Sequence, residues 1–319
     1  MIKRFLKYHP VHKKLVPKID IVFLLRPTLF FSIWVMVIMG MYSAQMNLIN
    51  HPLWIIGLSL KTFITFVSLT FVCSSTFILN QISDVESDII NNKLFLVGKY
   101  FNQKKSESIA KLLFISGMII AILANWLTTI FIGCIYLVWG VIYNHHPFNW
   151  KKKPILGWFA NSIVGVLLFM IGWHLVMRNQ LNSKLIILDI SMFGSMLPYL
   201  LCFASVALLT TLPDMKGDIG SGDKTFPIVY GKISAMLLSL ILICTAFVCS
   251  IYNEDPIAST ATLVSMPFFM IMVFRRMNKD ILRAIRYPIF ILNFFALSIY
   301  PWLFVPLVVT FYMSKYYYW

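Results

Sequence analysis

The amino-acid sequence predicts an all-α, polytopic membrane protein, built as a helical bundle of about nine transmembrane helices. Hydrophobic residues make up 59% of the 319 residues and charged residues only 12%, and the mean hydropathy is +0.80. This composition excludes an ordinary soluble domain. The apolar residues also form long stretches, and lysine and arginine gather between alternate stretches, which is typical of chains that cross a membrane many times.

Each predicted transmembrane helix is a stretch long enough to cross the hydrocarbon core, which takes about 20 mostly apolar residues. The nine stretches are residues 20–43, 55–79, 108–124, 127–144, 155–177, 190–213, 233–252, 257–274 and 287–313. The third and fourth are short. The last contains Pro301 and Pro306, so we expect a kink or a split there.

The N-terminal segment is basic and polar over its first eighteen residues, and the apolar stretch that follows is long enough to span. We therefore expect no cleavable signal peptide, but a basic cytoplasmic arm (1–19) followed by one membrane domain (20–319). Lysine and arginine stay on the cytoplasmic side of membrane proteins. With a cytoplasmic N-terminus, all but four of the 27 lie on that side; the exceptions are Lys61, Arg178, Lys184 and Lys315.

The net charge of +15 does not indicate a nucleic-acid partner, because the cations are spread over membrane-flanking loops without a recognisable nucleic-acid-binding module. Contact with the anionic head groups of the lipid bilayer explains this charge better. The five cysteines all lie in apolar stretches without a Cys-x-x-Cys pair, so we interpret them as small buried hydrophobic residues.

Half of the twelve acidic residues lie in two short clusters, within residues 80–88 and 214–223. Carboxylates beside a hydrocarbon phase are costly, and they commonly serve a function. Four predicted spans separate the two clusters. Because an even number of crossings returns the chain to the same side, both clusters are expected on the cytoplasmic side.

The spacing within the clusters indicates a metal site. Asn80, Asp84 and Asp88 are four residues apart, which places their oxygen atoms along one helix face, and Asp214 and Asp218 repeat the spacing. Crowded carboxylates repel one another unless cations intervene. Hard oxygen ligands suit Mg²⁺, which is commonly held by carboxylates and substrate phosphates. The alternative is that these are solvated loop carboxylates that offset nearby lysines.

Basic residues near the clusters fit a ligand that carries phosphate, since lysine binds phosphate as a point charge and arginine can bind it through two hydrogen bonds. The candidates are Arg26, Lys93, Lys224 and, in the loop from Tyr143 to Lys153, Lys151. Lys151 to Lys153 could instead serve only to set the topology.

These residues resemble the UbiA superfamily of intramembrane prenyltransferases, whose pattern pairs an Asn-x3-Asp-x3-Asp motif with a later Asp-x3-Asp motif. Asn80, Asp84 and Asp88 match the first motif, and Asp214 and Asp218 match the second. The resemblance runs from about residue 20 to the C-terminus. It also includes Arg26-Pro27, the loop Tyr143, Pro147, Lys151 and Pro154, and the Gly-Asp-Lys-Thr-Phe-Pro stretch that precedes Gly231.

The resemblance implies a bundle around a central cavity with a polar, cytoplasmic mouth, in a bacterial inner membrane. It implies Mg²⁺-dependent transfer of an isoprenyl group from a polyisoprenyl diphosphate to a hydrophobic acceptor, either aromatic or lipid. By family pattern, Asp84, Asp88, Asp214 and Asp218 are catalytic and bind the metal together with Asn80. The ligands of the diphosphate would be Arg26, Lys93, Tyr143, Lys151 and Lys224.

Two departures from the family pattern keep an alternative open. Gln81 stands where the family commonly has aspartate, and Asn149 where it often has arginine. A cyclase branch of the superfamily, which closes isoprenoid diphosphates on themselves, resembles this chain at Asn80-Gln81 and at Asn91. That branch tends to lose the middle aspartate, which is retained here as Asp84, so we favour a transferase. A cation-coupled transporter is a third hypothesis, but transporter ion sites lie near the bilayer midplane, not at span ends.

Aromatic side chains of the cavity could stabilise a carbocation through their ring faces. The sequence offers Trp158, Phe159, Trp173 and Tyr199, although packing is the commoner role for each. Asn161 and His174 fall within a predicted span, where polar side chains usually bind a neighbouring helix.

Overall fold

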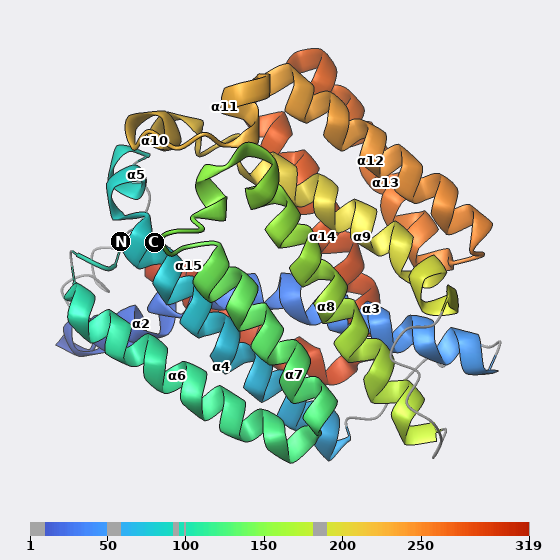
Figure 1. Ribbon diagram of the computed structural model, residues 1–319, viewed down its shortest axis with the longest axis horizontal. Helices are drawn as coiled ribbons and strands as arrows, with labels where there is room; N and C mark the ends of the chain where they lie inside the picture. Colours follow the sequence, from blue (N-terminus) through green and yellow to red (C-terminus); the bar gives the residue numbers. More distant parts are fainter. Residues whose placement is uncertain (1–9, 50–58, 92–95, 99, 181–189, 319) are drawn as a thin grey trace.

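The structure is a computed structural model that describes residues 10–49, 59–91, 96–98, 100–180 and 190–318, most of which are helical (Figure 1). Among them, eight helices are long and apolar enough to cross a membrane, and the apolar helix Trp126–Ile142 is shorter. The spanning elements are α3 (Phe30–Ile49, preceded by η1, Pro27–Leu29), α4 (Leu60–Ser83), α6 (Gln103–Ala124), α7 (Trp126–Ile135, continued by the π-helical η2, Tyr136–Ile142), α8 (Pro154–Gln180), α9 (Ile190–Thr210), α12 (Lys232–Tyr252), α13 (Pro256–Arg275) and α14 (Asn278–Ile299).

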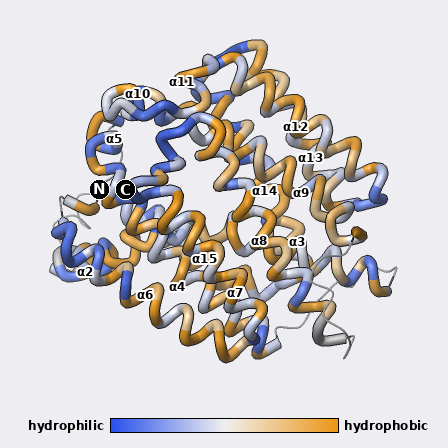
Figure 2. The backbone as a smooth tube through the Cα atoms, viewed as in Figure 1, coloured by the Kyte–Doolittle hydropathy of each residue, from blue (hydrophilic) through white to orange (hydrophobic). Residues whose placement is uncertain are grey.

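Short helices join the spans at the end that holds the acidic clusters: α5 (Val85–Ile90), η3 (Trp150–Lys152), α10 (Met215–Gly220) and α11 (Phe226–Tyr230). Figure 2 shows hydrophilic residues gathered around α5 and α10, and hydrophobic residues along the long helices. The predicted fold class, a polytopic helical bundle of about nine spans, is confirmed.

The first span begins at Pro27, not at residue 20 as predicted. Residues 20–24 belong to a separate helix, α2 (Pro10–Leu24), and Arg26 then adopts a left-handed backbone conformation with φ of 52°. The side chain of Gln81 on α4 donates a hydrogen bond to the carbonyl of Leu24 at 2.8 Å and so satisfies the end of α2. Hydropathy could not separate α2 from the span because both are apolar there.

The last predicted span, 287–313, is wrong in its bounds. The span is α14, which begins at Asn278 and ends before Pro301, and the chain then forms η4 (Pro301–Leu303) and a further helix, α15 (Phe304–Tyr318). The ring of Tyr317 stacks on Phe23 of α2 at 4.2 Å, and its hydroxyl donates a hydrogen bond to Asp20. α15 thus returns to the end where α2 lies (Figure 1), so Lys315 is no exception to the distribution of positive charge.

Small residues bring the spanning helices into close contact. A Cβ atom on Gly172 of α8 would lie 1.8 Å from the carbonyl oxygen of Val37, and one on Gly40 of α3 would lie 2.1 Å from that of Phe169. The backbones of α3 and α8 therefore touch at this crossing, as is typical of helix packing in membranes.

Candidate active site

A cavity of about 520 Å³ opens between α3, α4, α8, α9 and α14. Its mouth is polar and charged, and is lined by Arg26, Asn80, Asp84, Asp88, Tyr143, Asn144 and Asp214. Its depth is apolar apart from uncharged groups such as those of Ser32, Thr76 and Asn161. On α9 the lining residues follow a single helical stripe: Tyr199, Cys202, Phe203, Val206, Ala207 and Thr210.

The first acidic cluster keeps its three oxygen-bearing side chains on one face although the helix breaks within it. α4 ends at Ser83, Asp84 takes a non-helical conformation, and α5 carries Asp88. The amide of Asn80 donates a hydrogen bond to Asp84 at 2.8 Å. The predicted alignment of Asn80, Asp84 and Asp88 toward a common space is confirmed, since all three line the cavity.

The second cluster divides between the cavity and its rim. Asp214 lines the cavity, whereas Asp218, one turn further on α10, accepts a hydrogen bond from the hydroxyl of Thr225 at 3.2 Å. Burial raises the pKa of Asp218 to about 7, and the negative charges of Asp214, Asp223 and Asp84 add to this. Asp84 and Asp88 of the first cluster line the same cavity as Asp214 of the second, so the two clusters face a common mouth.

Asn91 and Gly217 join the clusters, and sequence reasoning missed this contact. The Asn91 side chain accepts a hydrogen bond from the Gly217 backbone N–H at 2.8 Å and donates one to the Asp214 carbonyl at 3.2 Å. A Cβ atom at position 217 would lie 2.2 Å from the Asn91 amide nitrogen. Only glycine therefore permits this approach of α10 to α5. The glycine between Asp214 and Asp218 was the available signal.

Three of the five predicted diphosphate ligands are close to the acidic residues. Arg26 lies at the mouth and pairs with Asp88 at 3.6 Å. Tyr143 lines the cavity, and burial and the nearby carboxylates raise its pKa. Lys151 is buried; its ammonium group donates to Ser83 at 2.6 Å and pairs with Asp84 instead of lining the cavity.

Of the other two predicted ligands, the structure describes only Lys224. The side chain of Lys224 is exposed and does not line it, while its backbone N–H bonds to the Lys152 carbonyl at 3.2 Å. Lys93 lies outside the described residues. The neighbouring Lys152 pairs with Asp223 at 2.7 Å, which ties the loop of η3 to the segment after α10.

The donor set fits a hard divalent cation, although the described residues include no group of three His, Cys, Asp or Glu side chains arranged as a ready metal site. Asp84, Asp88 and Asp214 nevertheless line one cavity, and the negative charges of Asp214 and Asp84 help to raise the pKa of Asp218. Oxygen donors of this kind suit Mg²⁺. The lysine on Asp84 supplies a positive charge within this group of carboxylates.

The aromatic lining differs from the sequence candidates. Of these, only Tyr199 lines the cavity. Trp158 donates to the carbonyl of Ala204, Phe159 is 51% exposed, and Trp173 is buried outside the cavity lining. Phe77, Trp139 and Phe203 line the cavity in their place.

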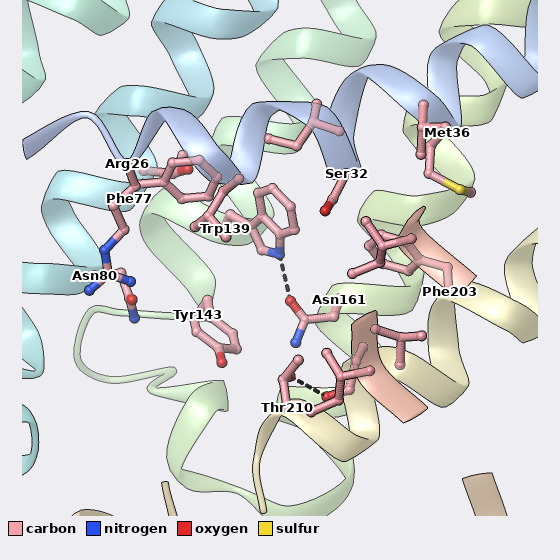
Figure 3. A pocket seen from close by; sticks show the side chains of 18 of the residues that line it. Arg26, Ser32, Met36, Phe77, Asn80, Trp139, Tyr143, Asn161, Phe203 and Thr210 are labelled. Atoms are coloured by element: carbon pink, nitrogen blue, oxygen red, sulfur yellow. Dashed lines mark hydrogen bonds between the residues drawn. The ribbon is translucent and has the colours of Figure 1, made fainter. Parts of the chain in front are cut away.

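Asn161 belongs to the cavity, whereas His174 does not. The Trp139 indole N–H donates to the Asn161 side-chain oxygen at 2.9 Å (Figure 3). Asn161 therefore orients an aromatic ring beside the acidic mouth. His174 stacks on Phe131 at 5.6 Å and is not among the lining residues.

Fold and site together define a membrane-embedded enzyme whose cavity has a charged mouth and an apolar depth, which suits a substrate with an anionic head and a long apolar tail. The model of the UbiA prenyltransferase family matches residues 33–295, and the chain belongs to this family. Membership of this family argues against the transporter hypothesis.

Relatives and solved structures agree with this assignment. The chain is 30% identical over 184 residues to digeranylgeranylglyceryl phosphate synthase from Methanobrevibacter smithii; the match covers 54% of this chain but only 60% of that relative. A UbiA homologue from Archaeoglobus fulgidus, solved with GPP and Mg²⁺, superimposes with a TM-score of 0.64 at 15% identity, over 88% of this chain and all of that one. A structure concerning digeranylgeranylglyceryl phosphate synthase gives 0.59 at 19% identity, over 90% and 97%.

Proposed function

We propose that this enzyme transfers an isoprenyl group from a polyisoprenyl diphosphate to the hydroxyl group of a lipid acceptor, in a Mg²⁺-dependent reaction at the cytoplasmic face of a bacterial inner membrane. The observation that carries the proposal is the pair of facing carboxylate clusters at the mouth of an apolar cavity. Only a ligand with a phosphate-bearing head, a bridging cation and a hydrocarbon tail uses all of these features.

The reaction breaks the bond between C1 of the donor and the diphosphate oxygen, and the electron pair leaves with the diphosphate. Asp84, Asp88, Asp214 and Asp218, with Asn80, would hold Mg²⁺, which when bound acts as a Lewis acid for the leaving diphosphate. Arg26 and Lys151 add fixed positive charge at the mouth. Lys224 and Lys93 remain predictions as diphosphate ligands.

The remaining allylic cation needs a dry, electron-rich environment. The ring faces of Phe77 and Trp139 supply one at the top of the apolar depth, and Asn161 holds Trp139 in place. Helices wall the cavity and exclude water, which would otherwise trap the cation. The acceptor oxygen then forms a bond to C1 and loses its proton.

The chemistry of the cavity favours a neutral acceptor group. Below the mouth, the polar lining residues that the structure describes carry uncharged groups, mostly hydroxyl and amide, and the cation Arg26 is paired with Asp88. A hydroxyl group can hydrogen-bond to such residues, whereas a carboxylate there would be an unpaired buried charge. The name of the Methanobrevibacter relative, a synthase of a glyceryl phosphate lipid, is consistent with a lipid acceptor.

The test is the release of diphosphate from isoprenyl diphosphates in membranes that contain Asp84→Ala or Asp214→Ala. We expect both variants to insert normally and to lose activity, while Glu107→Ala, a surface carboxylate on α6 that bonds to Gln103, retains it. Full activity in both aspartate variants would refute the proposal.

The cyclase remains the second candidate function, and the products distinguish it. Gln81, which suggested it, is buried, bonds to the Leu24 carbonyl and does not line the cavity. We expect gas chromatography of lipid extracts to show no hydrocarbon or terpene alcohol formed from the diphosphate alone. Such a product, made without an added acceptor, would establish the cyclase instead.

A further inference from the structure

The cavity ends at an aromatic ring deep in the bundle. Tyr199 is the lining residue of α9 furthest from the mouth, and Met36 of α3 also lines the cavity, near Phe203 of the α9 stripe (Figure 3). Tyr199 is only 1% exposed and Met36 also 1%. Thr210, at the other end of the stripe, lies eleven positions further along α9, which at 1.5 Å per residue is a depth of about 16 Å.

The walls beyond this point cannot move apart easily. Tyr199 packs against Phe169 of α8 with ring centroids 5.9 Å apart, and Phe169 packs against Trp173 at 6.3 Å. One turn beyond Met36, Gly40 meets the backbone of Phe169 at the α3–α8 crossing, where a Cβ atom would lie 2.1 Å from the carbonyl oxygen. Helices in backbone contact leave no space for a longer ligand.

The ring of Tyr199 is held from behind by a polar group. Asp255 caps α13 by accepting hydrogen bonds from the backbone N–H groups of Ile257 and Ala258 at 3.0 and 2.9 Å. Burial raises the pKa of Asp255, while the Tyr199 hydroxyl is close enough to lower it. That hydroxyl is buried and forms a side-chain contact with Asp255. The hydroxyl thus points past the cavity toward Asp255.

We propose that Tyr199, together with Met36, sets the length of the isoprenyl chain that the cavity accepts, an inference that rests on the proposed function. Three backbone bonds of an extended chain advance about 3.5 Å, so the four chain bonds of an isoprene unit advance about 5 Å. A depth of about 16 Å then holds about three units. A longer tail must bend or leave the cavity.

The test measures binding, not turnover, with non-reactive thiolodiphosphates of two to five isoprene units and Mg²⁺. Thermal stabilisation of the purified protein as a function of analogue concentration gives the Kd for each length. In the native protein we expect Kd to fall more than about tenfold with each added unit up to about three, because each unit buries five carbon atoms. Beyond that length, the gain in affinity with each added unit should stop.

The variants separate the volume of the ring from its hydroxyl. Tyr199→Ala should extend the gain by at least one further unit, and Met36→Ala, on a different helix, should shift it in the same direction. Tyr199→Phe keeps the ring and should keep the native profile. Phe193→Ala on α9, a 44% exposed residue outside the cavity lining, controls for the loss of an aromatic side chain and should also keep it.

Two outcomes would overturn the inference and are distinguishable from a failure of the proposed function. If every analogue binds but neither Tyr199→Ala nor Met36→Ala shifts the length at which the gain stops, the inference is wrong and the proposed function stands. The same conclusion follows if Tyr199→Phe shifts the profile as much as Tyr199→Ala. If no analogue binds the native protein at any length, both are wrong.

Discussion

Replacing Gly217 by alanine should push the two acidic clusters apart and so reduce catalysis. The new Cβ atom would lie 2.2 Å from the Asn91 amide nitrogen and 2.4 Å from the Ser87 carbonyl oxygen. Distances below 3 Å are not tolerated, and the second contact is with backbone, so α10 must move away from α5. The movement also breaks the Asn91 hydrogen bonds to the Gly217 N–H and the Asp214 carbonyl.

The magnitude follows from these contacts. Overpacking costs about 1–3 kcal/mol, and each lost hydrogen bond about 1 kcal/mol, so the free energy of unfolding should fall by about 3–5 kcal/mol. A displacement of about 1 Å between groups that act on the same diphosphate should lower kcat about 10²-fold.

The assay compares Gly217→Ala with Gly220→Ala, which lies in the same helix. At position 220 the nearest atom is the flexible end of the Ile90 side chain, at 2.5 Å, which can rotate away. We expect Gly220→Ala to keep its melting temperature and its rate of diphosphate release. Equal activity and stability of the two variants would show that the Asn91–Gly217 contact does not set the spacing of the clusters.

Three further predictions concern single residues in or near the mouth. Lys151→Met should lower the melting temperature, because it leaves Asp84 without its buried cation. Added Mg²⁺ should restore the stability of this variant but not its rate of diphosphate release. Rescue of both the stability and the rate would contradict a role for Lys151 at the diphosphate. Gln81→Leu should lower the free energy of unfolding by about 1–3 kcal/mol, because it leaves the Leu24 carbonyl unpaired. It should also raise KM for the donor, because Arg26 lies two residues after Leu24. An unchanged KM would show that the Gln81–Leu24 hydrogen bond does not position Arg26. Between pH 4 and 7, folded Asp218 retains a proton that the unfolded chain has released, since its pKa is raised from 3.8 to about 7. The melting temperature without metal should therefore fall as pH rises through this range, and Mg²⁺ should bind more tightly. Asp218→Asn should flatten both pH profiles. A pH dependence that persists in this variant would assign the two effects to another group.

Much of the fold follows from properties that are local in the sequence. A span is recognised by about 20 apolar residues in succession, and the distribution of lysine and arginine relates one span to the next. The spacing of Asn80, Asp84 and Asp88 places them on one face whether or not the helix is continuous, and they line the cavity although it breaks at Asp84. The carboxylates of the site were therefore predictable.

The limits of hydropathy appear at both ends of the chain. The predicted first and last spans each merged two helices, because α2 and α3, and likewise α14 and α15, are apolar on either side of the break. The breaks lie at Arg26 and at Tyr300, each followed by proline. Proline removes a backbone donor, but whether the chain kinks or turns back depends on what it then packs against.

By itself, the sequence determined the membrane class, the number of spans, the carboxylates of the mouth and the resemblance to a family of prenyltransferases, because helical periodicity and hydropathy act over a few turns of chain. Only the tertiary structure decided which residues far apart in the sequence contact one another at the site. Lys151 meets Asp84 from 67 residues away, and Asn91 meets Gly217 from 126 residues away. It also decided that Trp139 and Tyr199, not Trp158 or Trp173, line the cavity. Such contacts depend on the order and rotation of helices in the bundle, which no local pattern specifies.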